Sequence, residues 1–175
     1  MVRSAVWLTA GAREAVHALK YRGLPRIADD LAAVMARPAP AGDEPSVLVP
    51  IPLAARRLRQ RGYNQSEWLA AALGRRWQLP VRSDLLSRVR ETATQTALTP
   101  ETRLANVAGA FATRNAEVGT RNSSAFRVPT SGLILVDDVF TTGATLAEAA
   151  RALEQAGAQR VYGVTFGRAV IPDFT

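Results

Sequence analysis

The amino-acid sequence predicts an α/β fold, with a mainly parallel sheet flanked by helices, and three observations lead to this expectation. Short, entirely apolar runs such as residues 133–136 are typical of strands that are buried on both faces. Stretches with apolar residues at helical spacing alternate with these runs along the chain. The length of 175 residues corresponds to about one domain. We therefore expect a single compact α/β domain.

The expected elements follow one another in the order that such a fold needs. Helices are expected at residues 12–22, from Pro25 onward, at 64–77, at 99–107 and at 145–157. Strands are expected at 47–49, 133–136 and 161–166, with extended chain at 80–87. Pro25 suits the first turn of a helix, Asn64 can cap one, and Gly157 can end one.

The composition excludes several classes of site. The chain has no cysteine, so it cannot form disulfides, cysteine zinc sites, iron–sulfur clusters or thiol nucleophiles. His17 is the only histidine, which makes a serine–histidine–aspartate triad or a multi-histidine metal site hard to build. The formal net charge is +7, and Lys20 is the only lysine among the basic residues. Codon bias toward arginine in a GC-rich genome explains most of the preference over lysine. Arginine also binds anions through two parallel hydrogen bonds, so the excess is compatible with an anionic partner.

Targeting and membrane segments are not expected. No stretch approaches the roughly 18 apolar residues that a membrane span requires. The N-terminal residues carry charges and lack the apolar core of a secretory signal. We expect a cytoplasmic protein with no membrane insertion.

The segment 133–146 carries the clearest chemistry. A buried strand ends in Asp137 and Asp138, and a loop of hydroxyl residues around Gly143 leads into a helix. Ligands of α/β proteins bind at the carboxyl ends of the strands. The backbone N–H groups at a helix start attract phosphate. Carboxylates beside a phosphate site fit ribose hydroxyls or a divalent ion that bridges to the same ligand.

Other interpretations of this segment fit its residues less well. A Walker B strand needs an upstream GxxxxGK[ST] loop, and Lys20 does not lie in one. A phosphatase aspartate would need an acid at position 139, which is Val139. A loop that only caps a helix leaves two adjacent aspartates without a function, which is costly at the end of a buried strand.

The segment matches, at every position, the motif that binds 5-phosphoribosyl 1-pyrophosphate (PRPP) in type I phosphoribosyltransferases. Further blocks resemble the ComF family, also called ComF/GntX, of competence-associated phosphoribosyltransferase-like proteins. These blocks are Ala18–Gly23 (ALKYRG), Val49–Leu53 (VPIPL), Arg61–Gln65 (RGYNQ) and the series Arg88, Thr94, Gln95, Leu98, Arg103, Asn106, Val107 and Phe111. The resemblance extends from about Ala12 to Gly167.

This resemblance implies a type I phosphoribosyltransferase fold with a small N-terminal hood-like region. We assign residues 1–45 to a helical hood-like segment that packs on a core formed by residues 46–175. Family members usually begin with a four-cysteine zinc module. The chain has no cysteine, so we expect no zinc.

The resemblance also implies roles for individual residues. Asp137 and Asp138 would hold the ribose 2′- and 3′-hydroxyls and, directly or through the ligand, Mg²⁺. The 5′-phosphate would lie in the cradle formed by Thr141, Thr142, Gly143, Ala144 and Thr145. The pyrophosphate loop would be Ile51, Pro52 and Leu53. A mobile lid would run from Arg88 to Arg103, with Gln95 and Arg103 as its polar candidates.

An arginine cluster follows the expected pyrophosphate loop. On a helix, Arg57 and Arg61 share one face, and Arg56 and Arg59 share another. The cluster can be a solvated turn, can contact pyrophosphate through Arg56 and Arg57, or can form an interaction surface. In the last case Arg57, Arg59 and Arg61 would bind single-stranded DNA, with a base stacking on Tyr63.

Two functions are therefore expected. The first is a phosphoribosyltransferase-like protein that binds PRPP or ribose 5-phosphate with Mg²⁺ and takes part in natural competence, DNA uptake and transformation. If it turns over, it transfers the phosphoribosyl group to an acceptor for which the sequence has no signature. The alternative is a non-catalytic module that binds single-stranded DNA or competence partners such as the DNA-uptake helicase.

Overall fold

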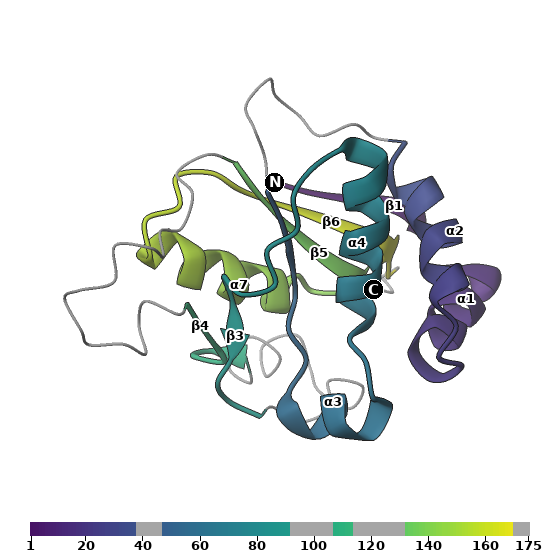
Figure 1. Cartoon of the computed structure of the whole chain (residues 1–175), viewed down its shortest axis with the longest axis horizontal. Helices are drawn as coiled ribbons and strands as arrows, with labels where there is room; N and C mark the ends of the chain where they lie inside the picture. The colour runs from purple at the N-terminus through teal and green to yellow at the C-terminus, as the bar shows by residue number, and fades with distance from the viewer. Residues whose placement is uncertain (38–46, 92–106, 114–131, 170–175) are drawn as a thin grey trace, which may run out of the picture.

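A computed structural model describes residues 1–37, 47–91, 107–113 and 132–169 (Figure 1). Its centre is a four-stranded sheet in the order β1–β6–β5–β2, in which every neighbouring pair is parallel. These strands are β1 (Val2–Trp7), β6 (Val161–Arg168), β5 (Leu133–Phe140) and β2 (Val47–Pro50). A small antiparallel pair, β3 (Ser87–Arg88) and β4 (Phe111–Ala112), lies outside this sheet. The predicted parallel α/β architecture is confirmed.

Helices cover both faces of the sheet (Figure 1). They are α1 (Ala10–Tyr21), α2 (Pro25–Met35) and α4 (Gln65–Trp77) on one face and α7 (Ala144–Gln155) on the other. The short helix α3 (Ala55–Arg61) has no buried residue and covers neither face. Successive residues of a strand point to opposite faces. Ile134 and Val136 accordingly pack in one apolar cluster with α1, α2 and α4, and Leu133 and Leu135 pack in another with α7. Both faces of β5 are therefore buried, which explains its continuous apolar run.

The helices α1, α2, α4 and α7 lie at expected positions, whereas no helix was assigned to the residues of α3. The strands of the central sheet differ chiefly in two places. The sequence analysis assigned no strand to β1, which pairs along its length with β6 at the edge of the sheet. The strand expected at 133–136 continues to Phe140, because β6 supplies partners as far as the pair Phe140–Arg168. Asp137 and Asp138 therefore lie inside β5 and do not follow it.

Two expectations for the middle of the chain have a different outcome. Within the extended stretch predicted at 80–87, Val81 forms a single parallel bridge to Leu48, and β3 begins at Ser87. The helix expected at 99–107 lies almost entirely outside the described residues. In the described part of the chain, no helix has both the length and the apolar character needed to cross a bilayer.

Candidate phosphoribosyl site

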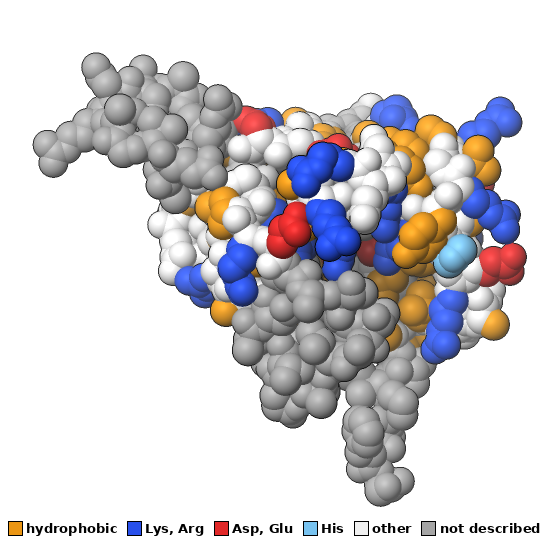
Figure 2. All heavy atoms as spheres, turned by 90° about the horizontal axis from the view of Figure 1, so that it is seen from below, with side chains coloured by type: hydrophobic (Ala, Val, Ile, Leu, Met, Phe, Trp, Pro, Cys, Tyr) orange, Lys and Arg blue, Asp and Glu red, His pale blue; other side chains and the backbone are white. Residues whose placement is uncertain are grey.

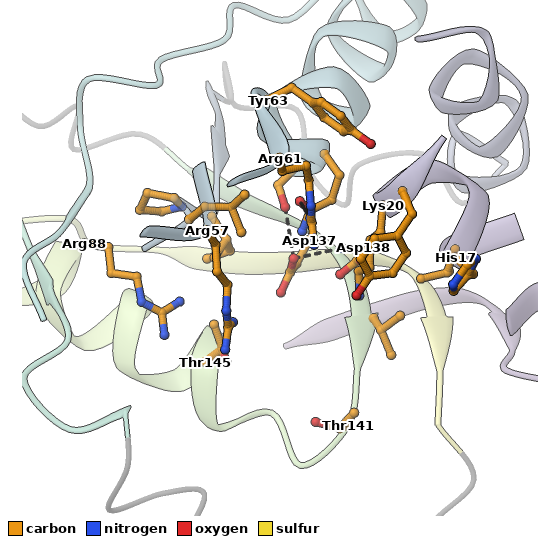
Figure 3. A pocket seen from close by; sticks show the side chains of 18 of the residues that line it. His17, Lys20, Arg57, Arg61, Tyr63, Arg88, Asp137, Asp138, Thr141 and Thr145 are labelled. Atoms are coloured by element: carbon orange, nitrogen blue, oxygen red, sulfur yellow. Dashed lines mark hydrogen bonds and ion pairs between the residues drawn. The ribbon is translucent and has the colours of Figure 1, made fainter. Parts of the chain in front are cut away.

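A cavity of about 740 Å³ opens beside the carboxyl ends of β2 and β5 (Figure 3). These strands are parallel neighbours, so the segments that follow them meet at the same edge of the sheet. The cavity brings together most of the site residues predicted from the sequence. Those that line it are Ile51, Pro52, Leu53, Arg57, Arg61, Tyr63, Arg88, Asp137, Asp138, Thr141 and Thr145.

Two carboxylates lie at the centre of this cavity. Oδ1 of Asp137 accepts a hydrogen bond from Oγ of Ser66 at 3.0 Å and another from the backbone N–H of Asp138 at 2.9 Å. Oδ2 of Asp138 forms an ion pair with Nζ of Lys20 at 2.6 Å. The Asp138 side chain is only 6% exposed, yet it borders the cavity. Both carboxylates are thus held in place by residues from other elements.

The two aspartates have different electrostatic environments. Burial and the negative charge of Asp138 raise the pKa of Asp137 to about 7, although the hydrogen bonds from Asp138 and Ser66 and the charge of Lys20 oppose this rise. At neutral pH, Asp137 therefore exchanges between its protonated and ionised forms. Asp138 has the lysine as a direct counter-ion. The pair can offer both a donor and acceptors to neighbouring hydroxyl groups.

The loop after β5 leads into the first turn of α7. Thr141 and Thr145 border the cavity, whereas Thr142, Gly143 and Ala144 are not among its lining residues. Gly143 has a φ of 80° and precedes the helix, and a Cβ atom there would lie 2.8 Å from the ring of Phe140. The turn therefore requires glycine. Backbone N–H groups and threonine hydroxyls at this position can bind a phosphate.

The loop after β2 is fixed against the carboxylate strand. The N–H group of Ile51 donates to the carbonyl of Val136 at 3.0 Å. The side-chain amide of Asn64 donates to the carbonyl of Ile51 at 3.0 Å, and its oxygen accepts from the N–H group of Ser66. Asn64 thus joins this loop to the start of α4, as a cap of the predicted kind.

Basic side chains lie beside these loops. As the helical spacing predicts, Arg57 and Arg61 of α3 both border the cavity, and Arg56 and Arg59 are exposed and do not. Burial and the nearby positive charge of Arg57 lower the pKa of Arg88. Basic side chains predominate over acidic ones near the centre of the face seen in Figure 2. This side of the cavity favours an anionic ligand.

One wall of the cavity was missed by the sequence analysis. Arg13, Val16, His17, Lys20 and Tyr21 all border it, and they occupy one face of α1. Their spacing of three and four residues could have indicated a common face. Nothing in the sequence could have shown which strand this face approaches. Figure 3 shows Lys20 and His17 on the opposite side of the carboxylates from Arg57 and Arg88.

Tyr63 has a structural role in the cavity wall. Its ring stacks on Trp68 with the centroids 4.0 Å apart and the planes at 3°. Its hydroxyl donates to the carbonyl of Leu19 at 2.9 Å and accepts from the N–H group of Gly23 at 3.2 Å. One ring face and the hydroxyl group are thus engaged within the chain. The two lid candidates, Gln95 and Arg103, lie outside the described residues.

The residues at the centre of the cavity fit a magnesium ion only together with a ligand. No group of three or more potential metal-binding side chains occurs within the described ranges. Mg²⁺ commonly takes one or two carboxylates and completes its shell with water and ligand oxygens. The contacts of Asp137 with other described residues use Oδ1, so Oδ2 remains as a hard oxygen donor. Asp137 and Asp138 are the residues that would hold such an ion.

Comparison with known proteins agrees with this geometry. Residues 25–168 match the model of the phosphoribosyl transferase domain. The chain belongs to the phosphoribosyl transferase domain family. The predicted type I phosphoribosyltransferase fold is thereby confirmed. A structural neighbour is the glutamine PRPP amidotransferase from B. subtilis complexed with ADP and GMP, with a TM-score of 0.50, 15% identity, and coverage of 85% of this chain and 30% of that chain.

Curated relatives support the ComF resemblance within this family. The chain is 36% identical over 154 residues to the DNA utilization protein YhgH of Salmonella typhimurium, covering 83% of this chain and 62% of that protein. It is 33% identical over 117 residues to competence protein F of Haemophilus influenzae, covering 67% of this chain and 48% of that protein. The aligned part of this chain therefore spans between about half and two thirds of these relatives.

Proposed function

We propose that the protein binds PRPP or a related 5-phosphoribosyl ligand, together with Mg²⁺, in the cavity at the carboxyl end of the sheet. One observation carries this proposal. The carboxylate pair with the loop before α7, the loop after β2 with Arg57, and Arg88, which the sequence places in three separate segments, surround a single cavity. A phosphorylated sugar carries groups that match each of these features.

The proposed orientation assigns each part of the ligand to one segment. The ribose hydroxyls lie at Asp137 and Asp138, and the 5′-phosphate lies in the loop from Thr141 to Thr145. The pyrophosphate lies at the loop Ile51–Leu53, beside Arg57 and Arg88. Carboxylates accept hydrogen bonds from hydroxyl groups, and guanidinium groups bind phosphate oxygens, so each contact is charge-assisted.

These residues also suit the transfer of a phosphoribosyl group. Displacement at the anomeric carbon passes through an oxocarbenium-like state, as in glycoside chemistry. Arg57 and Arg88 would stabilise the negative charge that develops on the leaving pyrophosphate. Bound Mg²⁺ would supply additional positive charge. The walls formed by α1 and α3 would limit the access of water to the sugar.

The biological setting that we propose is DNA uptake in the cytoplasm of a competent cell. The names of the two curated relatives refer to DNA utilization and to competence. This supports a role of the phosphoribosyl site in natural transformation. The acceptor of the group would then be a component of that process.

Isothermal titration of the purified protein with PRPP and Mg²⁺ tests the ligand proposal. We expect saturable heat for the wild type and a Kd at least tenfold higher for Asp137→Asn, which removes the charge but keeps the shape. Arg160→Gln, a change on the surface segment before β6 and outside the cavity lining, serves as the control and should bind as the wild type does. The absence of heat with the wild type would contradict the proposal.

A second candidate function is the binding of single-stranded DNA or a competence partner without catalysis. It is favoured by Arg56 and Arg59, which are exposed on α3 and do not border the cavity. Fluorescence anisotropy with a labelled oligonucleotide tests this function. Affinity should fall with rising salt, and Arg56→Ser with Arg59→Ser should weaken it more than Arg57→Ser does. Equal affinities would exclude a DNA surface on this face of α3.

A further inference from the structure

The only lysine of the chain contacts the carboxylate pair. Nζ of Lys20, from α1, lies 2.6 Å from Oδ2 of Asp138, on β5. Figure 3 shows this side chain directed from the helix toward the carboxylate. The lysine side chain is 27% exposed and the aspartate side chain 6%. The ion pair is therefore mostly shielded from water, where a charge–charge contact fixes geometry more firmly than on an open surface.

The chain segment around Lys20 is held independently of this ion pair. The hydroxyl of Tyr63 bonds to the carbonyl of Leu19 and to the N–H group of Gly23, on either side of the lysine. The ring of Tyr63 is itself fixed by stacking on Trp68 of α4. Leu19 is completely buried. The C-terminal end of α1 is thus held against α4. This contact fixes the backbone from which Lys20 extends toward Asp138.

We propose that Lys20 is a positioning residue for the sugar, acting through Asp138; this inference rests on the proposed phosphoribosyl function. The ion pair engages Oδ2 and leaves Oδ1 as the acceptor for a ribose hydroxyl. A carboxylate that is already oriented loses less conformational entropy when the sugar binds. Lys20 therefore strengthens binding of the ribose ring and contributes little to binding of the phosphate, which lies at the loop before α7.

The alternative to a positioning role is a structural one, in which the ion pair would hold α1 against the sheet. The two roles differ in which ligand they affect. If the ion pair only held α1 in place, or if only the positive charge of Lys20 mattered, its loss would weaken the binding of every anionic ligand. If the ion pair positions Asp138 for the sugar, its loss weakens the binding only of ligands that carry the ribose hydroxyls. Ribose 5-phosphate and inorganic phosphate form a suitable pair of probes, since both are anions and only the first has the sugar.

The test measures Kd for both probes by isothermal titration, at one fixed Mg²⁺ concentration. We expect Lys20→Met to raise the Kd of ribose 5-phosphate about tenfold, and to change that of phosphate less than about twofold. Lys20→Arg, which keeps the charge, should recover most of the affinity. Arg22→Met removes one positive charge just beyond α1 and outside the cavity lining, and should bind both probes as the wild type does.

A double-mutant cycle shows whether Lys20 acts through Asp138. In the Asp138→Asn background, Lys20→Met should have no further effect on ribose 5-phosphate. The double variant removes both charges of the ion pair and therefore leaves neither one buried without its partner. Its comparison with Asp138→Asn remains informative even if Lys20→Met alone does not fold. Equal weakening of both probes, or additive effects in the cycle, would overturn the positioning role. If the wild type binds no ribose 5-phosphate, the proposed function fails and not this inference alone.

Discussion

Oγ of Ser66 donates a hydrogen bond to Oδ1 of Asp137 at 3.0 Å, across 71 residues of sequence. The serine is completely buried in the first turn of α4, whose cap, Asn64, also holds the loop after β2. The start of this helix therefore contacts both a carboxylate of the candidate site and the loop proposed for pyrophosphate. The first turn of α4 thus links the Asp137 carboxylate on β5 to the loop that follows β2.

Removing the serine hydroxyl should weaken the ligand site more than the fold. With Ser66→Ala, the Asp137 carboxylate loses a donor that stabilises its ionised form and its orientation. We expect the Kd of ribose 5-phosphate to rise about five- to tenfold, as for the loss of one hydrogen bond of ~1 kcal/mol or slightly more. Ser4→Ala breaks the hydroxyl contact between Ser4 on β1 and Thr165 on β6, neither of which borders the cavity. That variant should bind normally, and an equal loss in both would contradict the assignment.

The raised pKa of Asp137 predicts a pH-dependent stability. The ordinary pKa of an aspartate side chain is 3.8 and that of Asp137 in the fold is about 7, so the folded state binds this proton more tightly than the unfolded chain does. The contribution of Asp137 to the free energy of unfolding therefore falls as the pH rises between these values. Asp137→Asn stays neutral throughout this range. Its Tm relative to the wild type should increase from pH 5 to pH 8 in circular dichroism melts, and a difference that does not change with pH would contradict this account.

The sequence predicted which residues border the cavity wherever these residues are local to one motif. Asp137, Thr141 and Thr145 follow from one strand, loop and helix, and Ile51 follows from the neighbouring strand. Parallel strands carry such segments to a common edge, so the order of elements is sufficient to bring them together. The arrangement of α3 was also predictable, because helical periodicity alone separates Arg57 from its exposed neighbours.

Other features depend on packing that the sequence does not reveal. Lys20 reaches Asp138 because α1 joins the apolar cluster that α2 and α4 form on one face of β5, and no local pattern indicates that contact. The strand β1 contains Arg3 and Ser4, and it exists as a strand because β6 offers it an open edge. The strand β5 continues through its two aspartates for the same reason, since β6 pairs with it beyond them.

Asn64 is expected to support both stability and binding. Asn64→Ala removes a helix cap and leaves the carbonyl of Ile51 without its side-chain donor. Urea denaturation should show a loss of about 2 kcal/mol in the free energy of unfolding. Asn64→Ser keeps a side-chain oxygen that can cap the helix, loses the amide donor and adds no charge at this buried position. Its helix should be retained while the Kd of PRPP rises, and unchanged binding would show that the loop after β2 does not depend on this bond.

Glu148 is expected to affect stability alone. Its carboxylate accepts hydrogen bonds from Arg151 and from the N–H group of Gly109, and these contacts lower its pKa. Because the pKa of Glu148 is lower in the folded protein than in the unfolded chain, its ionised carboxylate stabilises the fold at pH values above the unfolded-state pKa. This stabilisation is lost as the pH falls through the folded-state pKa. Glu148→Gln should lower the Tm at pH 7, with a smaller effect near pH 4. Its binding of ribose 5-phosphate should match that of the wild type, because Glu148 does not border the cavity.

A crystal structure of the complex with ribose 5-phosphate would test the central claim most directly. The account predicts the 2′- and 3′-hydroxyls within hydrogen-bond distance of Asp137 and Asp138, and the phosphate against the backbone of residues 141–145. A sugar bound at any other surface, or a phosphate bound on the α1 side beside His17, would contradict it.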